Sequence, residues 1–329
     1  MLGWVLTAVL CAVAVVSLAP GWVGLSTTTP VAQAIALRPL LVVGFGLLGA
    51  LLLLAVLVAA LRRRWWPRRT VLAVVLLVVA AGHAWVLYDR GIEDAPLPEP
   101  REGAFTVLAL NTFGGGASTQ QVADVAQEVG ADVLALPETS QTSAEAIAGA
   151  LAERTGTTFQ VFARTTGRWD ANSAALLVST ELGDYEEAAA PQTWHASVRA
   201  EPVDGNGPTL LAVHPLSPHE PGAAMDRWAE DLEAVAQVCR SEPGVVVAGD
   251  FNATLDHGPL RDIGDCVDAS VEGGVGGVGT WPANLPRLLG APIDHVLLDA
   301  ERFAVDAAAI LEVGASDHRA VVAQLSAVE

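Results

Sequence analysis

Eight polar residues in the second two-thirds of this 329-residue chain could bind a metal ion or a phosphate group. Each lies close to one end of a short apolar run of the kind that forms a buried strand. Strand ends that meet at one rim of a sheet are where α/β enzymes build their sites, so we expect these side chains to converge. The residues are Asn111, Glu138, His214, Asp250, Asn252, Asp294, Asp317 and His318.

The residue types indicate metal-assisted phosphoryl chemistry. The carboxylates of Glu138 and Asp317 and the amide oxygen of Asn111 are hard oxygen ligands, which suit Mg²⁺ or Mn²⁺. Such a metal neutralises phosphate charge and polarises phosphorus toward attack. Asp250 can orient or deprotonate a water, and Asn252 can donate to a developing phosphoryl oxygen.

Histidine can complete such a site. His318 can donate to a phosphoryl oxygen, and a carboxylate such as Asp294 can hold its tautomer. The set is poor for zinc hydrolysis, which prefers clusters of His and Cys. The sequence also lacks the Gly-x-Ser-x-Gly elbow of serine hydrolases, and it has no Lys with which to build a phosphate-binding loop.

Six short motifs carry these residues, and their order is specific. They are Leu110-Asn111, Pro137-Glu138, His214-Pro215, Gly249-Asp250-Phe251-Asn252, Ile293-Asp294-His295-Val296 and Ser316-Asp317-His318. The series resembles the endonuclease/exonuclease/phosphatase superfamily, which includes apurinic endonucleases, deoxyribonuclease I-like nucleases, neutral sphingomyelinases and inositol-polyphosphate 5-phosphatases. The resemblance covers about residue 104 to the C-terminus.

The resemblance implies an α+β fold in which two β-sheets flanked by helices form a four-layer α/β/β/α sandwich. It also implies that Asn111 and Glu138 contribute to a site for Mg²⁺ or Mn²⁺, with Asp317 near the metal. The residue before the metal-site Glu is commonly Gln in this family, whereas this chain has Pro137. That Gln is not a required ligand, so the departure leaves the metal site intact.

The same resemblance implies the catalytic roles. Asp250 would position the nucleophilic water, and Asn252 would support it. His318 would contact the scissile phosphate, paired with Asp294. His214 matches a mid-chain His of the deoxyribonuclease and sphingomyelinase branches.

Alternating strand and helix patterns should position these residues. Independently of the resemblance, this interleaving over the body favours a single α/β or α+β domain. Capping boxes predict helix starts at Ser118 with Gln121 and at Thr142 with Glu145. Predicted strands cover 105–110, 132–136, 159–162, 174–178, 196–200, 209–213, 244–248, 293–298, 303–310 and 320–325, and predicted helices cover 118–129, 142–154 and 221–239.

Residues 1–88 differ from the rest of the chain, because they contain six Arg and no Asp or Glu. Three apolar runs in this head, at about 2–20, 39–61 and 71–88, approach the ~20 residues that a membrane-spanning helix needs. We therefore predict three transmembrane helices. A cleaved signal peptide is the alternative for the first run, but no basic segment precedes it and two more runs follow.

The charges predict an orientation in the cell membrane. Five Arg lie within residues 62–69, and the positive-inside rule makes that loop cytoplasmic. Trp65 and Trp66 in the same loop suit an interfacial anchor. The chain then starts in the cytoplasm, crosses the bilayer as a multi-pass protein and delivers the body, residues 104–329, to the outside. Residues 89–103, with three alternating Pro, predict an extended linker that holds the body off the bilayer.

Composition narrows the function of the body. Residues 91–329 carry 11 Arg against 36 Asp and Glu, a net charge of −25. The first hypothesis is an outward-facing, membrane-anchored phosphoesterase for a small or lipid-linked phosphate ester. The second is an extracytoplasmic nuclease, which the acidic charge disfavours because phosphate neutralisation by basic residues dominates nucleic-acid affinity. A non-catalytic binding module is the third, and the full motif set argues against it.

The remaining Cys, His and Arg residues carry weaker signals. Cys239 and Cys266 could form a disulfide if the body is outside, or they could be two buried thiols. Three histidines without a motif are interpreted as surface or core residues, and two basic residues that could flank the site are interpreted as exposed loop residues. These are His195, His219 and His257, and Arg164 and Arg168.

Overall fold

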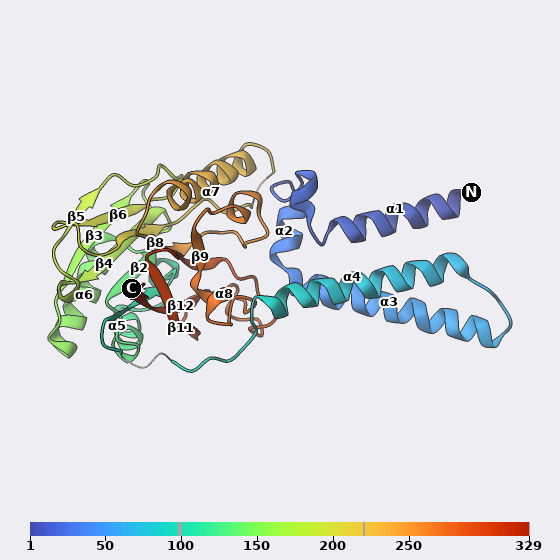
Figure 1. The fold of residues 1–329 in the computed structure, drawn as a ribbon, viewed down its shortest axis with the longest axis horizontal. Coiled ribbons are helices and arrows are strands. Elements are labelled where there is room, and N and C mark those ends of the chain that lie inside the picture. Colours follow the sequence, from blue (N-terminus) through green and yellow to red (C-terminus); the bar gives the residue numbers. More distant parts are fainter. Residues whose placement is uncertain (98–100, 220, 329) are drawn as a thin grey trace.

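The apolar runs of the body pair into two six-stranded sheets that pack face to face (Figure 1). The structure is a computed structural model that describes residues 1–97, 101–219 and 221–328. The first sheet consists of β1 (Ala104–Ala109), β2 (Val133–Pro137), β3 (Phe159–Thr165), β4 (Ser173–Ser179), β11 (Phe303–Glu312) and β12 (Arg319–Ala327). Its strand order is β11-β12-β1-β2-β4-β3, and only β1 and β2 pair in parallel.

The second sheet repeats this mixed pattern. It consists of β5 (Tyr185–Ala188), β6 (Val198–Pro202), β7 (Thr209–Val213), β8 (Val245–Asp250), β9 (Cys266–Asp268) and β10 (Asp294–Asp299). Its order is β5-β6-β7-β8-β10-β9, with β7 and β8 parallel. In both sheets the parallel pair is central, and its carboxyl ends carry the polar residues expected at the site.

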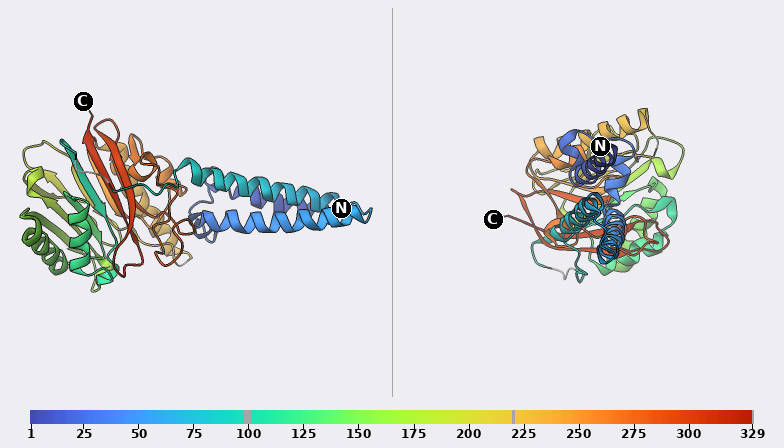
Figure 2. Two further views of the ribbon diagram at one scale, coloured as in Figure 1. Left: turned by 90° about the horizontal axis from the view of Figure 1, so that it is seen from below. Right: turned by 90° about the vertical axis from the view of Figure 1, so that its right-hand side faces the viewer.

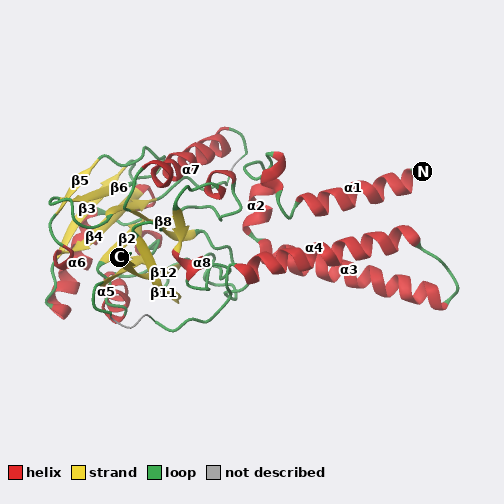
Figure 3. Cartoon of the chain, in the orientation of Figure 1, coloured by secondary structure: helices red, strands yellow, loops and turns green. Residues whose placement is uncertain are grey.

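Side-chain alternation explains the layers. Val107 and Ala109 of β1 face the other sheet, whereas Leu108 faces outward, because successive side chains in a strand point to opposite faces. Both faces of the central strands are therefore buried, and helices must cover the outer ones. Helices α5 (Thr119–Glu128) and α6 (Gln141–Thr155) cover the first sheet, and α7 (Ala223–Ser241) covers the second (Figure 3). The predicted α+β sandwich is confirmed.

Helix starts follow local capping chemistry. Ser118 caps α5 with the predicted box, since its side chain accepts from Gln121 N and its own N–H donates to Gln121 Oε1 at 3.0 Å. The predicted start at Thr142 is wrong, because Ser140 has the extended backbone and caps α6 two residues earlier. Helix α7 begins after Gly222, whose φ of 84° is not helical, and not at residue 221.

Short elements without strong sequence patterns complete the body. Strands β5 and β9 were not expected from the sequence, because neither has a run of apolar residues. The short helices are α8 (Ala269–Glu272), η2 (Phe113–Gly115), η3 (Asp170–Asn172), η4 (Thr180–Leu182) and η5 (Gly258–Arg261).

The head consists of helices that run away from the body (Figures 1 and 2). They are α1 (Leu2–Val16), η1 (Pro20–Val23), α2 (Val31–Ala36), α3 (Arg38–Leu61) and α4 (Pro67–Asp89). Within the described residues, two helices, α3 and α4, are long and apolar enough to cross a bilayer. Three transmembrane helices are not shown, because α1 has 15 residues and ends before Pro20 starts a separate turn.

A buried ion-pair cluster joins head and body. The guanidinium groups of Arg38, at the start of α3, and Arg90, at the end of α4, both contact Asp256 of the body, with N–O distances of 2.7 and 2.8 Å. The Arg90 carbonyl also accepts from Gly276 N at 2.9 Å. The first part of the predicted 89–103 spacer therefore lies against the body, and its residues 98–100 lie outside the described ranges.

This cluster should weaken at low pH. Burial opposes ionisation of Asp256, but Arg90 and Arg38 outweigh it and lower the pKa of Asp256 to about 2. His83 and His257 also lie within electrostatic range of this carboxylate. A carboxylate whose pKa is lower in the folded than in the unfolded state stabilises the fold at pH values above its unfolded pKa of about 4. That stabilisation is lost as the pH falls toward the folded pKa. We expect the thermal midpoint of the full chain in detergent to fall over this pH window.

The midpoint of Asp256→Ala should be lower already at neutral pH. In this variant two buried cations lose their partner, at a cost of about 3–5 kcal/mol. Asp262→Ala, an exposed carboxylate on the same segment, is the matched control. Equal midpoints for both variants would contradict a stabilising cluster.

Cys239 on α7 and Cys266 on β9 are joined in a disulfide, with Cα atoms 5.6 Å apart and a sequence separation of 27. Closing a loop of this length restricts the unfolded chain by about 3.5 kcal/mol. We expect the double variant Cys239→Ser/Cys266→Ser to melt about 7–14 °C lower by circular dichroism. Cys11→Ser changes the free cysteine of α1 and should leave the body's midpoint unchanged.

Candidate active site

The two parallel strand pairs bring the expected residues to one rim of the sandwich. Asn111 lies two residues past the end of β1, whereas Glu138 and His214 directly follow β2 and β7. Asp250 ends β8, and its register partner across the antiparallel ladder is Asp294, the first residue of β10. The sheet register therefore sets two carboxylates side by side at the same rim.

Asp250 is the centre of the cluster and is buried. Its Oδ2 accepts from Asn111 Nδ2 at 3.0 Å, and its Oδ1 accepts from the backbone N of Asn252 at 2.8 Å. The Nε2 atoms of His214 and His318 each lie 3.7 Å from Asp250 Oδ2. These distances leave the carboxylate facing both imidazoles without a direct hydrogen bond to either.

His318 is oriented by Asp294. Its Nδ1 lies 2.9 and 3.1 Å from the two oxygens of the Asp294 carboxylate, whose side chain is fully buried. The Thr280 hydroxyl accepts from the backbone N of Asp294 at 3.2 Å. Ser316 Oγ accepts from His318 N at 3.0 Å and donates to Asn111 O at 2.7 Å, which ties this segment to the end of β1.

The buried charges shift the pKa values of the cluster. Burial raises the pKa of Asp250 to about 7; the neighbouring Asp294 also raises it, while His318 lowers it. Burial opposes protonation of His318, but the carboxylates of Asp294 and Asp250 outweigh it and raise its pKa to about 10. His214 is held neutral, since burial and then the nearby His195 and His318 lower its pKa well below its usual value.

Glu138 and Asp317 supply further carboxylate oxygens. Asn111 Nδ2 also donates to Glu138 Oε1 at 3.1 Å, and burial raises the pKa of Glu138. Asp317 Oδ2 accepts from Trp281 Nε1 at 3.1 Å, whereas its Oδ1 is buried without a hydrogen-bond partner in the described ranges. A buried carboxylate oxygen without a donor suits a cation ligand, so this donor set fits a divalent metal.

A second set of atoms could also hold a metal. Ligand atoms of Asp250, Asp294 and His318 lie within 4.8 Å of one another. The amide of Asn111 is turned with its nitrogen toward the carboxylates and its oxygen toward Phe113 N, at 2.9 Å. A role for that oxygen as a ligand therefore requires the opposite amide orientation.

Backbone strain gathers at this rim. Four non-glycine residues in the described ranges have positive φ, and three of them line the cavity described next: Phe113 at 53°, Glu138 at 57° and Asn252 at 50°. Such conformations are costly for residues with a Cβ and occur where the surrounding structure fixes a side chain for function.

The residues open onto a cavity of about 500 Å³. Seven of the eight expected residues line it, and Asp294 does not, because it lies buried behind His318. The sequence did not predict six of the other lining residues, Gln33, Ala36, Leu37, Phe113, His195 and His219. The rings of His195 and His214 stack with centroids 4.6 Å apart.

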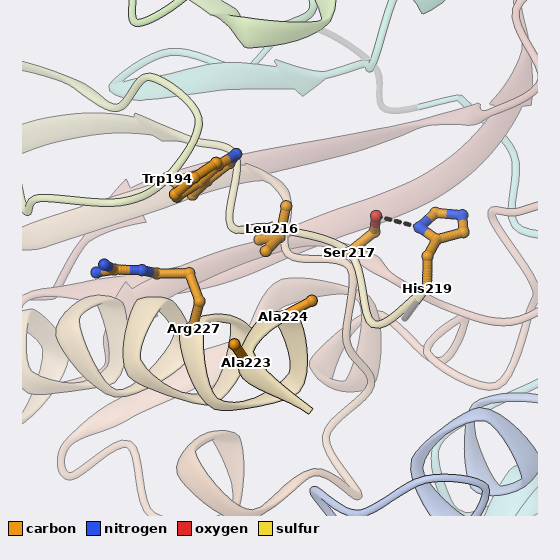
Figure 4. A pocket seen from close by; sticks show the side chains of 7 residues that line it. All are labelled: Trp194, Leu216, Ser217, His219, Ala223, Ala224 and Arg227. Carbon is orange, nitrogen blue, oxygen red and sulfur yellow. Dashed lines mark hydrogen bonds between the residues drawn. The ribbon is translucent and has the colours of Figure 1, made fainter. Parts of the chain in front are cut away.

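His219 is an exposed residue and His195 is half-buried, and both also border the cavity, which the sequence did not predict. His257 is a core residue, fully buried against Trp228. A neighbouring pocket shares Ser217 and His219 with the cavity, and its wall includes Arg227 and Trp194 (Figure 4).

A known protein family matches the part of the chain that carries this site. The sequence model of the Endonuclease/Exonuclease/phosphatase family matches residues 108–318. The chain belongs to this family. Its members hydrolyse phosphodiester or phosphate-ester bonds and depend on divalent metals, so the chain carries the fold of a metal-dependent phosphoesterase or nuclease.

Several solved structures are similar to this chain. D. rerio TDP2, solved with a single-strand DNA product, is 14% identical, with a TM-score of 0.53 over 68% of this chain and 100% of that chain. The human Nocturnin catalytic domain with a bound sulfate anion is 13% identical, with a TM-score of 0.46 over 70% and 96%. A family protein from Bacteroides thetaiotaomicron is 17% identical, with a TM-score of 0.49 over 69% and 98%. No curated protein matches the chain significantly.

Proposed function

We propose that this chain is a membrane-anchored phosphoesterase that requires Mg²⁺ or Mn²⁺ and uses water to attack phosphorus. The observation that supports it most is the single cavity in which Asp250 faces two imidazoles beside the oxygen donors of Glu138 and Asp317. Glu138, Asp317 and the Asn111 amide would hold the metal, which neutralises phosphate charge and polarises phosphorus when bound.

Asp250 is the proposed base. Its Oδ1 accepts from the Asn252 backbone N–H, which holds the carboxylate facing the cavity. The water oxygen forms its bond to phosphorus while the ester P–O bond breaks, and Asp250 receives the water's proton. The leaving oxygen takes a proton from solvent.

His318, His214 and Asn252 are the proposed donors to the phosphoryl oxygens. The gap of 3.7 Å between His318 Nε2 and Asp250 suits an imidazolium that hydrogen-bonds to an oxygen on phosphorus rather than to Asp250 itself. His214 has the same separation from Asp250 on the other side. Donors that are fixed before the reaction stabilise negative charge as it develops on phosphorus.

Asp294 is a positioning residue in this proposal, because it acts through His318. We expect Asp294→Asn to lower kcat about a hundredfold with little change in KM, since the amide no longer stabilises the imidazolium. The matched control is Asp268→Asn, which disrupts the other buried pair, His295 Nδ1–Asp268 Oδ2 at 2.5 Å. If both variants lose activity only in proportion to their unfolded fraction, Asp294 is merely structural.

The proposed anchor consists of residues 1–88, with the catalytic domain at 104–329. Aromatic residues support two interfaces on α4: Trp66 precedes the helix, and Trp85 and Tyr88 end it. The 19–22 residues between them correspond to about 28–33 Å of helix, which matches the ~30 Å hydrocarbon core. Helix α1 packs on α4, and the first residues of α1 lie at the Arg-rich end of α4 (Figure 1). This packing supports α1 as a third membrane helix.

The proposed topology leaves the Arg-rich loop and the N-terminus in the cytoplasm and the catalytic domain outside. The Cys239–Cys266 disulfide supports that side, because disulfides persist in oxidising compartments. Protease added to intact cells should cut the body and spare the 62–69 loop. Cleavage of that loop with protection of the body would reverse the topology.

The activity test uses the full chain with Mg²⁺, with Mn²⁺ or with chelator. Its substrates are methyl p-nitrophenyl phosphate, p-nitrophenyl phosphate and supercoiled plasmid. We expect metal-dependent hydrolysis of a small ester. Metal-dependent nicking of plasmid alone would favour the second candidate, a nuclease, despite the net charge of −25 on residues 91–329. Hydrolysis that is the same with metal and with chelator would contradict the proposal.

A further inference from the structure

The membrane head forms part of the cavity wall. Gln33, Ala36 and Leu37, from α2 and the residue after it, line the same cavity as Asp250 and His318. The catalytic domain by itself would lack this side of the cavity, and no motif of the proposed chemistry requires it. A wall built from another part of the chain therefore restricts what reaches the catalytic residues.

Direct contacts fix this wall to the body. Gln33 Nε2 donates to Pro218 O at 2.6 Å, and His257 Nε2 lies 3.1 Å from Ala32 O. Arg38, one residue after the wall, forms its buried ion pair with Asp256. Polar contacts within α2 and just after it thus hold the wall in one position against the catalytic rim.

The wall lies where a bilayer would end. Leu37 directly precedes α3, whose 24 residues correspond to about 36 Å of helix against a hydrocarbon core of ~30 Å. The cavity is therefore level with the headgroup layer of the outer leaflet. Trp22, Trp85 and Tyr88, all exposed, mark the same level. Below the cavity, α3 presents exposed apolar side chains such as Leu40 and Val43.

We propose that the cavity takes the phosphate-ester headgroup of an amphiphile whose apolar chain stays in the bilayer, and that α2 is the wall that selects it. This inference rests on the proposed phosphoesterase function. The headgroup enters beside Gln33, Ala36 and Leu37, while the apolar chain lies along the exposed face of α3. A cavity of about 500 Å³ has room for such a headgroup.

The test uses two diesters that share the scissile bond and differ in their tail, methyl and hexadecyl p-nitrophenyl phosphate. The full chain is reconstituted in phosphatidylcholine vesicles with Mg²⁺ or Mn²⁺. The hexadecyl ester is placed either in the protein's own vesicles or in separate ones. We expect kcat/KM for the hexadecyl ester in the protein's own vesicles to exceed kcat/KM for the methyl ester at least about tenfold. It should exceed kcat/KM for the hexadecyl ester in separate vesicles by the same factor.

Two matched variants test the wall itself. Ala36→Trp fills the cavity side of α2, whereas Ala34→Trp puts the same side chain on its exposed side. We expect Ala36→Trp to lower the hexadecyl rate at least about tenfold more than it lowers the methyl rate, with a thermal midpoint equal to that of the wild-type protein as the evidence of correct folding. Ala34→Trp should match the wild-type protein on both esters.

The outcomes separate the two proposals. Hydrolysis of the methyl ester with no advantage for the hexadecyl ester, or an Ala36→Trp variant that equals Ala34→Trp on both, overturns the inference and leaves the phosphoesterase standing. Metal-dependent plasmid nicking that exceeds hydrolysis of both esters makes the head a tether for a nuclease. If neither ester nor plasmid is cleaved with metal, the proposed function fails, and this inference fails with it.

Discussion

Asp250→Asn is expected to lower turnover about 10³- to 10⁴-fold, because it removes the base that receives the water's proton. The substitution keeps the size of the side chain, but the amide accepts only one of the two hydrogen bonds that the carboxylate accepts from Asn111 and Asn252. It removes the negative charge that faces His214 and His318 at 3.7 Å. The measurement is the initial rate on methyl p-nitrophenyl phosphate at saturating metal, compared with wild type in the same detergent.

A stability measurement shows whether this loss is catalytic. The ionised Asp250 is buried beside the carboxylate of Asp294, and burial raises its pKa, so the charge itself is unfavourable in the folded state. We expect the thermal midpoint of Asp250→Asn to equal or exceed that of wild type. A loss of activity that parallels a lower midpoint would assign Asp250 a structural role, and a rate near wild type would refute the mechanism.

The rim of the site was predictable because each of its residues is fixed by its immediate neighbours. The apolar runs that form β1 and β2 end just before Asn111 and Glu138, which places these polar side chains at the edge of the sheet. Convergence then follows from topology, since the pairing of β8 with β10 sets Asp250 opposite Asp294. Local pattern and global fold agree at these positions, as expected for residues under functional constraint.

The far walls of the cavity were not predictable in the same way. His195 reaches the site by stacking on His214, and Gln33 reaches it through Pro218, a partner 185 residues away in sequence. Neither residue belongs to a sequence motif or to a regular spacing of apolar residues that would predict its position. Such contacts depend on how separate units pack, and hydrophobic patterning does not encode that packing.

The head shows the limit of hydropathy alone. The apolar run at 2–20 is continuous in composition, yet the helix ends at Val16 and a separate turn begins at Pro20, because Pro starts helices more readily than it continues them. The Pro-rich segment after α4 likewise gave no sign that Arg90 would pair with Asp256. Composition predicted an anchor, whereas the contacts that join the head to the site are long-range.

Glu138→Ala decides which group of residues holds the metal. Two sets compete: Glu138 with Asp317, whose Oδ1 is buried without a partner in the described ranges, and the cluster of Asp250, Asp294 and His318. In the second set the Asp294 carboxylate already accepts from His318 through both oxygens, and it does not line the cavity. We therefore expect the first set to bind the metal and Glu138→Ala to lower kcat/KM at least about 10³-fold, because a metal ligand supports several kcal/mol of charge stabilisation.

Thermal stabilisation by the metal provides a readout that does not need turnover. A ligand that binds only the folded state at a hundred times its Kd stabilises it by about 2.7 kcal/mol. We expect Mn²⁺ to raise the midpoint of the wild-type protein and to have no such effect on Glu138→Ala. The control is Glu145→Ala, an exposed carboxylate on α6, which should respond like wild type. If Glu138→Ala keeps the full response and Asp294→Asn loses it, the metal belongs to the Asp250, Asp294 and His318 cluster, and His318 cannot then serve as the phosphoryl donor proposed above.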